Sequence, residues 1–336
     1  MKILGIESSC DETAASVVVD GKKILSNVVA TQIPFHTKYQ GVVPELASRK
    51  HIEWIQPVVH EALEEASLSI NDIDAVVATN RPGLMGSLLV GLTFGKTLAW
   101  SLGKPFLAVN HMLAHLYAAH LLEDVSYPYL GLLVSGGHTI ICKVNNFDDI
   151  EILGTTIDDA AGEAFDKIAK YYDFGYPGGA IIDKLAQKGN RLAAKFPVPI
   201  FHDPKHRYDV SYSGLKTAVI NQIDQFWNKD FEKTPENIAA SFQEAAVKTL
   251  VSRLFLAIED TGLKTIVAGG GVAANSRLRE LLAERDDLHC IFPPLKLCGD
   301  NGAMIAGIAY KFFQRGETSD WNVGCSSRIE GFRHPR

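Results

Sequence analysis

The sequence contains few cysteines, and their spacing excludes two common classes of site. The five cysteines are an odd number, and none of them forms a C-x-x-C pair. They are Cys10, Cys142, Cys290, Cys298 and Cys325. Neither a disulfide framework nor a zinc ribbon is indicated, and the pattern favours a reducing compartment.

The chain also lacks an excess of positive charge. Its formal net charge is −6 at pH 7. Proteins that bind nucleic acid through their overall charge are strongly basic, and this one is not. Any contact with nucleic acid must therefore come from a local patch or from a partner protein.

The sequence contains no long hydrophobic run, and we expect no secretory leader. The most apolar stretch, residues 84–102, is rich in Gly and contains Lys96, whereas a bilayer span needs about 20 clean apolar residues. We expect a buried helix there. The first residues, MKILGIESSCDET, run directly into strand-like sequence without a cleavage site. We therefore expect the mature chain to start here and to be cytoplasmic, with an exposed basic tail over residues 326–336.

Alternating strand and helix patterns predict an α/β fold with mixed sheets. With 336 residues, 46% of them hydrophobic, the chain is long enough for two lobes. Residues 2–7 and 14–19 read as strands around a small polar turn, and residues 129–134 and 139–144 repeat that pattern. Helices are predicted over residues 44–66, 158–173, 181–195, 238–261, 274–284 and 301–314. The repetition favours two similar lobes.

A histidine pair is the first candidate for chemistry. His111 and His115 in NHMLAHL are four residues apart, so on a helix their rings share one face and suit one metal ion. A pair of core or surface histidines is the alternative. Met112 replaces the glutamate of the H-E-x-x-H pattern, which argues against a zinc peptidase. Asp300, just ahead of a predicted helix, is a candidate third ligand or an ordinary helix cap.

Glycine-rich turns occur in different parts of the chain, and those at 135–138 and 269–277 follow predicted strands. They are SGGH at 135–138, YPGG at 176–179 and GGGVAANSR at 269–277. Glycine lets successive backbone N–H groups approach an anion, so these turns favour a nucleotide phosphate, although each one alone is also an ordinary turn.

Carboxylates near these turns are candidate acceptors for ribose hydroxyls. Asp159, Glu163 and Asp166 have the spacing of one helical face, and Asp183 follows Gly179 by one turn. A solvated acidic face is the alternative for the first three.

The first predicted turn carries Cys10, Asp11 and Glu12. Asp is common in turns for conformational reasons alone. No base adjoins Cys10 in the sequence, so a buried small residue is favoured over a nucleophile.

Several segments together resemble, in order and over almost the whole chain, the bacterial TsaD family, once labelled O-sialoglycoprotein endopeptidase. They are IESSCDET, GGVVPELASRKH, NHMLAH, LVSGGHT, IDDAAGEAFDK, YPGG, SYSGLKT, GGGVAANSRLR and CGDNGAMIA. The resemblance implies a two-lobed actin-like (ASKHA) fold. It also implies transfer of threonylcarbamoyl from threonylcarbamoyl-AMP to N6 of the adenosine 3′ to the anticodon, in tRNAs that read ANN codons.

The resemblance carries specific expectations for residues. It implies that His111, His115 and Asp300 hold one divalent metal, Fe²⁺ or alternatively Zn²⁺. It implies that the adenylate is bound by Leu133, Val134, Ser135, Gly136, Gly137, Asp166, Gly179, Asp183 and Asn275. Asp11 or Glu12 would then accept the proton from the amine, a role suggested by their location.

Domains and partners follow from the same resemblance. The expected lobes are residues 1–127 and 128–300, with helix 301–316 packing back on the first lobe and a tail over 317–336. The expected partners are tRNA, a TsaB-like inactive paralogue and a TsaE-like ATPase in a heteromeric complex. Candidate tRNA contacts are Lys205, Arg207, Lys216, Arg328, Arg333 and Arg336.

One departure from the family pattern lies before the Gly-rich helix, where Arg81 occupies a position that is usually glycine. Two alternative functions fit parts of the sequence. An actin-like ATPase or small-molecule kinase explains the glycine turns but not the histidine pair. A non-catalytic scaffold of a tRNA-modification complex agrees with the acidic net charge.

Overall fold

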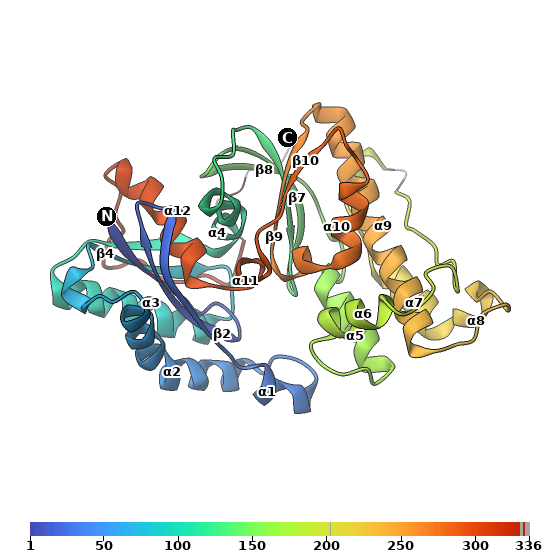
Figure 1. The fold of residues 1–336 in the computed structure, drawn as a ribbon, viewed down its shortest axis with the longest axis horizontal. Helices are drawn as coiled ribbons and strands as arrows, with labels where there is room; N and C mark the ends of the chain where they lie inside the picture. The colour runs from blue at the N-terminus through green and yellow to red at the C-terminus, as the bar shows by residue number, and fades with distance from the viewer. Residues whose placement is uncertain (202, 330–331, 333–336) are drawn as a thin grey trace. The chain divides into compact units, whose positions relative to one another are not determined.

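The chain folds into two compact units (Figure 1). The computed structural model describes residues 1–201, 203–329 and 332. Unit 1 comprises Met1–Ser126, Phe147–Asp149 and Pro293–Phe332, and unit 2 contains Tyr127–Asn146 and Ile150–Phe292. None of the described helices has the length and apolar character that crossing a bilayer requires.

Unit 1 is built on a five-stranded mixed sheet in the order β3-β2-β1-β4-β5. Its strands are β1 (Lys2–Glu7), β2 (Glu12–Val19), β3 (Lys23–Thr31), β4 (Ala75–Arg81) and β5 (Phe106–Asn110). Its described helices are α1 (Ile33–His36), α2 (Pro44–Glu65), α3 (Met85–Leu102), α4 (His111–Tyr117), α11 (Leu295–Cys298) and α12 (Gly302–Gln314), with the 3₁₀ turns η1 (Thr37–Tyr39), η2 (Ile70–Asp72) and η3 (Ala118–Leu121). The first three strands are antiparallel, whereas β1, β4 and β5 are parallel to one another.

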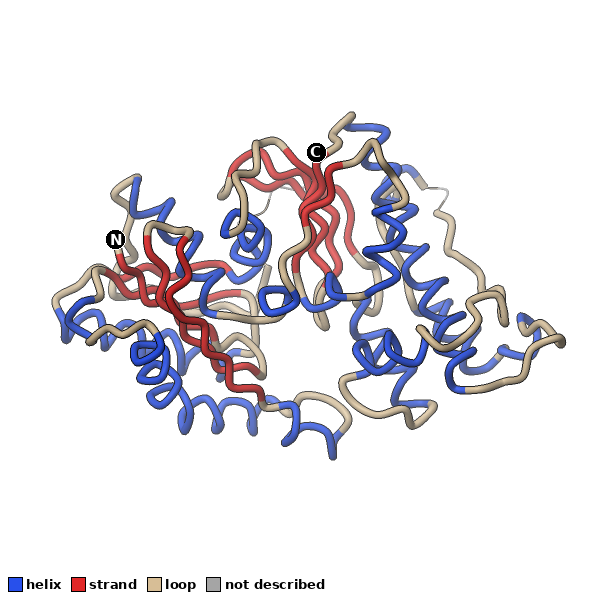
Figure 2. Tube along the Cα trace, viewed as in Figure 1, coloured by secondary structure: helices blue, strands red, loops and turns tan. Residues whose placement is uncertain are grey.

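Unit 2 contains a second five-stranded sheet in the order β10-β9-β6-β7-β8. Its strands are β6 (Tyr129–Val134), β7 (Thr139–Asn146), β8 (Asp149–Thr155), β9 (Thr265–Gly269) and β10 (His289–Ile291). Its described helices are α5 (Ala161–Tyr171), α6 (Gly178–Ala186), α7 (Ser213–Asn221), α8 (Ile223–Phe226), α9 (Pro235–Thr261) and α10 (Ser276–Ala283), with the 3₁₀ turns η4 (Pro204–His206) and η5 (Gly271–Ala274). Figure 2 shows the helices of this unit gathered beside its sheet.

The two sheets have the same strand order when each is read from its hairpin end. In both, the first strand pairs antiparallel with the second and parallel with the fourth. The structure therefore confirms the predicted α/β fold with a duplicated mixed sheet. This topology places the carboxyl ends of three parallel strands at one edge of each sheet, where α/β proteins commonly bind ligands.

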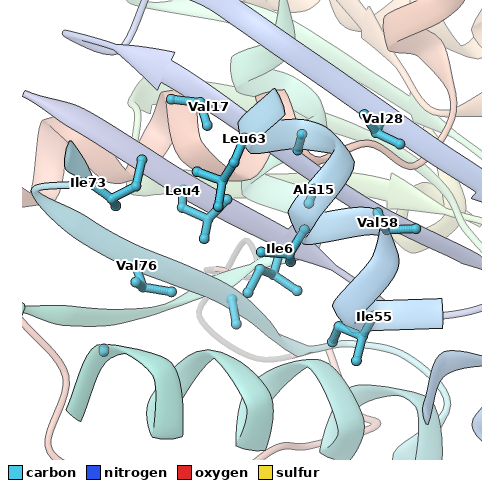
Figure 3. Close-up of a cluster of buried hydrophobic side chains, with 14 of the residues drawn as sticks. Leu4, Ile6, Ala15, Val17, Val28, Ile55, Val58, Leu63, Ile73 and Val76 are labelled. Atoms are coloured by element: carbon cyan, nitrogen blue, oxygen red, sulfur yellow. The ribbon is translucent and has the colours of Figure 1, made fainter. Parts of the chain in front are cut away.

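The core of unit 1 forms because α2 presents an apolar stripe to the sheet. Ile55, Val58 and Ala62 recur at helical spacing and are buried together with Leu4 and Ile6 of β1 (Figure 3). Burying an aliphatic side chain of this size contributes about 1.5–3 kcal/mol. The other face of the sheet packs against α12, so a helix from near the end of the chain stabilises its first strand.

Several predicted helix boundaries differ from the observed ones, and two of them bear on candidate site residues. The helix predicted over residues 181–195 runs from Gly178 to Ala186. The chain after it packs on the start of α9, where Gly189 lies against the backbone of Glu236 and Asn190 N donates to Asn237 Oδ1. The helix predicted from residue 158 begins at Ala161. Asp159 therefore precedes the helix instead of sharing a face with Asp166, and its carboxylate pairs with lysines.

Candidate metal centre and nucleotide-binding residues

The histidine pair lies at the carboxyl end of β5, where the chain turns directly into α4. The side chain of Asn110 starts this helix by accepting hydrogen bonds from Met112 N at 2.9 Å and Leu113 N at 3.4 Å, a standard helix N-cap. Helical spacing then brings the two rings together edge to face. The Nε2 atoms of His111 and His115 are 3.0 Å apart, and both side chains are buried.

Asp300 completes a cluster with these two rings. Its Oδ1 lies 3.2 Å from His115 Nε2 and 3.4 Å from His111 Nε2. The helix-capping role that the sequence allowed for Asp300 belongs to Asn301, which accepts from Met304 N. Within the described residues, these three form the only group of His, Cys, Asp or Glu side chains that could hold a metal ion.

A buried carboxylate that the sequence analysis missed stands behind His111. Glu7, the last residue of β1, is fully buried, and its Oε2 lies 2.9 Å from His111 Nδ1. The same carboxylate accepts hydrogen bonds from Thr79 Oγ1 and from Ser9 N. An ionisable residue at the end of a buried apolar strand was the only signal in the sequence that could have revealed it.

The electrostatics differ between the two histidines. Burial acts to lower the pKa of His111, but the carboxylates of Glu7 and Asp300 outweigh it and raise that pKa to about 9. Burial and the charge of His111 together lower the pKa of His115.

The donor set fits a divalent ion. Two imidazole nitrogens and one carboxylate oxygen converge with all ligand atoms within 4.8 Å of one another. This is a common ligand combination for zinc and non-haem iron. A coordinated imidazole must be deprotonated at the metal-facing nitrogen, and the acceptor behind His111 Nδ1 favours that arrangement.

The turn between β1 and β2 carries the two candidate proton acceptors. Two backbone carbonyls of this turn accept hydrogen bonds. The Cys10 carbonyl accepts from His51 Nε2 at 3.0 Å, and the Asp11 carbonyl accepts from Gln32 N at 3.0 Å. Burial, together with Asp11 and Asp300, raises the pKa of Glu12 well above its usual range. Burial and Asp11 do the same to the pKa of the Cys10 thiol, which argues against Cys10 as a nucleophile.

In unit 2 the turn after β6 offers open backbone. Ser135 N donates to His138 O at 2.8 Å, which closes the turn, and nothing lies within 4 Å of where a Cβ on Gly136 or Gly137 would sit. Leu133 and Val134, just before the turn, have buried side chains. Any ligand contact from them must come from the backbone.

A second glycine turn follows β9 and leads into α10. Gly270 has φ +90°, and a Cβ there would collide with the carbonyl oxygen of Val134. Asn275 caps α10 by accepting from Leu278 N at 3.0 Å, and its Nδ2 donates to Gln243 at 2.9 Å. Glycine is therefore required at position 270 for both conformation and space.

The two predicted ribose acceptors also have structural partners. One oxygen of Asp183 accepts from Ser276 N at 3.1 Å and from Ser276 Oγ at 2.7 Å. One oxygen of Asp166 accepts from Gly178 N at 2.7 Å. Gly179, on the first turn of α6, has open space beside its Cα. The Asp166 contact thus connects α5 to α6, and the Asp183 contacts connect α6 to α10.

A cavity of about 500 Å³ opens beside these residues, between the end of α6 and the helices α9 and α10. Gln243 and Ser276, the partners of Asn275 and Asp183, are among its lining residues. Its charged lining residues are Lys188, Arg191, Glu244, Arg277 and Glu280.

Two of the candidate tRNA contacts are paired with carboxylates of the chain. Arg207 forms an ion pair with Asp260, and Lys216 pairs with Asp159 at 2.6 Å. Their charges are thus partly neutralised within the chain. Arg333 and Arg336 lie outside the described residues.

Solved structures establish the fold class. Component A of (R)-2-hydroxyglutaryl-CoA dehydratase from Acidaminococcus fermentans superimposes with a TM-score of 0.57 at 17% identity, over 93% of this chain and 98% of that one. HypF from T. kodakarensis gives 0.61 at 16% identity, over 94% of this chain and 48% of that one. At this identity the likeness concerns the fold alone, which is actin-like.

Curated relatives are much closer in sequence. A protein of Treponema denticola named tRNA N6-adenosine threonylcarbamoyltransferase is 74% identical over 99% of this chain and 98% of its own length. A protein of the same name from Borrelia duttonii is 49% identical over 100% of this chain and 99% of its own. The family model "TsaD: tRNA N6-adenosine threonylcarbamoyltransferase" matches residues 23–307. The chain therefore belongs to the TsaD family of tRNA-modifying transferases.

Proposed function

We propose that this transferase takes threonylcarbamoyl from threonylcarbamoyl-AMP and attaches it, with metal assistance, to N6 of the adenosine 3′ to the anticodon of tRNAs that read ANN codons. The observation that carries the metal part is the convergence of His111, His115 and Asp300 on one point. A peptidase would need a glutamate base beside the first histidine, and Met112 stands there instead.

The reaction is an acyl transfer to a weak nucleophile. The lone pair of an exocyclic adenine amine is delocalised, so the donor must be activated and held in place. A bond forms between N6 and the carbonyl carbon of the donor, the bond from that carbon to the phosphate oxygen breaks, AMP leaves, and the amine loses one proton. A divalent ion, Fe²⁺ or alternatively Zn²⁺, supplies Lewis acidity for the donor carbonyl when it is bound by His111, His115 and Asp300.

Donor binding is assigned to unit 2. The backbone of residues 133–137 faces the phosphate of the adenylate, because open glycine backbone lets N–H groups reach an anion. The cavity beside Asp183 and Asn275 is polar and large enough for part of a nucleoside. Asp166 and Asp183 accept from ribose hydroxyls, and the open space at Gly179 admits the ligand.

Proton removal is assigned to the turn between β1 and β2. Asp11 or Glu12 accepts the proton from N6 as the new bond forms. Burial, together with Asp11 and Asp300, raises the pKa of Glu12, so its ionised carboxylate is a stronger base than that of an ordinary glutamate.

We further propose that the enzyme is cytoplasmic and works with a TsaB-like paralogue and a TsaE-like ATPase. The net charge of −6 is unfavourable for binding a polyanion, and carboxylates of the chain partly neutralise Arg207 and Lys216. The isolated chain should therefore bind tRNA weakly, and the partners should tighten binding.

The test is a single-turnover assay with purified chain, its partners, unmodified tRNA and synthetic threonylcarbamoyl-AMP. We expect one AMP released for each modified adenosine. The same preparation should cleave no glycoprotein. A metal-dependent cut in a glycoprotein that disappears with His111→Ala, while transfer to tRNA persists, would overturn the proposal.

A further inference from the structure

Glu7 is a buried carboxylate that the transfer chemistry does not use. It lies at the carboxyl end of β1 with 0% of its surface exposed. Burying an ionised carboxylate is unfavourable by several kcal/mol unless it is paired and hydrogen-bonded. Among the described residues, the Glu7 carboxylate forms an ion pair with His111. A group this unfavourable to bury needs a reason for being there.

Every recorded contact of this carboxylate is with a donor. Ser9 N donates to Oε1 at 2.5 Å, Thr79 Oγ1 donates to Oε2 at 2.5 Å, and His111 Nδ1 lies 2.9 Å from Oε2. An ionised carboxylate only accepts hydrogen bonds. The imidazole of His111 must therefore carry a proton on Nδ1.

That proton determines what the other nitrogen can do. With Nδ1 protonated, a neutral His111 has its lone pair on Nε2. Nε2 is the atom that faces His115 at 3.0 Å and Asp300 at 3.4 Å. The carboxylate thus selects the tautomer in which the metal-facing nitrogen is a ligand.

The second histidine has no such support. Nδ1 of His115 is buried without a hydrogen-bond partner among the described residues. His115 contacts Asp300 and His111 through Nε2. Of the two rings, the one with a carboxylate behind its Nδ1 is therefore His111.

The sheet explains why these groups meet. β1 runs parallel to β4 with Ile6 opposite Ala78, and β4 runs parallel to β5 with Thr79 opposite Val109. Glu7 follows Ile6 on β1, and Thr79 follows Ala78 on β4, so these two residues are neighbours. On β5, Val109 is followed by Asn110 and then by His111. Three parallel strands thus end side by side and place carboxylate, hydroxyl and imidazole at one edge.

We propose that Glu7, held by Thr79, is the positioning residue of the metal centre: it keeps Nδ1 of His111 protonated and so presents Nε2 to a divalent ion. The inference rests on the proposed metal function of His111, His115 and Asp300. Outer carboxylates of this kind typically change metal affinity by about 10–100-fold when they are removed.

The main test is metal affinity of the full-length zinc-loaded chain, measured by competition with a chelator. Glu7→Gln should weaken zinc binding about 10–100-fold. Thr79→Val removes one donor at nearly constant volume and should weaken it less. Thr13→Val is the matched control, because Thr13 is an equally buried threonine whose Oγ1 lies 2.8 Å from another imidazole, that of His51. Its zinc affinity should match that of the wild-type chain.

A second readout does not depend on any variant. Nitrogen-15 NMR of histidine in the zinc-loaded wild-type chain should show His111 protonated at Nδ1. Protonation at Nε2, or zinc affinity of Glu7→Gln within twofold of wild type, overturns the inference. If Glu7→Gln does not fold, Thr79→Val and the NMR tautomer decide the question.

The outcomes also separate this inference from the proposed function. If the wild-type chain binds no divalent metal, the metal centre is wrong and this inference falls with it. If wild type and Glu7→Gln bind zinc equally well and wild type modifies tRNA, only the role of Glu7 is overturned.

Discussion

The two units share one sheet topology but carry different chemistry at the same place in it. In unit 1 the carboxyl ends of the parallel strands β1, β4 and β5 bring together Glu7, Thr79 and, at the start of α4, His111, so that edge carries ionisable and hydroxyl side chains. In unit 2 the strands β6 and β9 end in glycine turns whose backbone is open. The topology decides where a site forms, and the residues at the strand ends decide which chemistry it offers.

A close approach of backbone is common to both edges. Gly83, after β4, has no room for a Cβ beside Ser9, and Gly270, after β9, has none beside Val134. In each unit a glycine that follows the second parallel strand packs against backbone at the carboxyl end of the first: Gly83 after β4 near the end of β1, and Gly270 after β9 at the end of β6. The duplicated fold thus keeps its steric requirement even where the functional groups have diverged.

The largest effect should come from removing the side chains that distinguish unit 1. His111→Ala combined with His115→Ala should abolish metal binding and reduce transfer by on the order of 10³-fold, because Lewis acidity and two ligands are lost together. The stability should fall, because Glu7 loses its buried ion-pair partner, so transfer is compared under conditions in which the variant is shown to be folded. Metal analysis, circular dichroism and the tRNA assay are measured on the same sample. Full transfer by the metal-free variant would contradict the proposed mechanism.

The steric requirement of unit 2 gives the next largest effect. Gly270→Ala forces a Cβ into the backbone at a positive φ and should destabilise the chain by about 2–4 kcal/mol. Gly271→Ala is the control, because a Cβ there meets nothing within 4 Å. Denaturant unfolding compares the two variants. Equal free energies of unfolding for both would show that the turn tolerates a side chain.

Acid should destabilise unit 1 through a buried histidine away from the metal centre. Burial and the charge of Lys311 lower the pKa of His120 to about 4. Its unfolded pKa is about 6.5, so the folded state takes up this proton later as pH falls. The neutral, buried His120 therefore contributes to the free energy of unfolding above pH 6.5. Acidification reduces that free energy, by about 2 kcal/mol at pH 5.

The measurement is the free energy of unfolding of the metal-free chain at pH 7 and pH 5. His120→Gln should flatten this pH dependence, whereas His60→Gln, at an exposed position, should leave it as in wild type. An unchanged slope in His120→Gln would rule out the assignment.

The smallest effect concerns donor binding in unit 2. Asp183→Asn keeps an oxygen that can accept from Ser276 but loses the charge that favours ribose hydroxyls, so the KM for threonylcarbamoyl-AMP should rise about tenfold, or about 1.4 kcal/mol. Metal content should be unchanged. Asp224→Asn, at an exposed position, serves as the control. A KM equal to wild type would remove Asp183 from the donor site.

Local sequence already indicated much of the architecture. Hydrophobic periodicity located most helices and strands, and small polar or glycine turns after strands marked the repeat, because such patterns depend on neighbours in the chain. Boundaries failed where a distant contact intervened. The helix predicted to residue 195 stops at Ala186, and the chain after it packs Gly189 and Asn190 on the start of α9; no local pattern shows that contact.

The sequence by itself determined the histidine pair, since four residues on a helix bring two rings to one face whatever surrounds them. Only the tertiary structure decided what the pair faces. His111 lies 104 positions from Glu7, and His115 lies 185 positions from Asp300. Glu7 and His111 meet because parallel strand pairing carries residues far apart in the chain to one edge of a sheet, and strand register over such separations is set by packing of the whole unit. Asp300 reaches them because α12, which begins just after it, packs on β1 and α4.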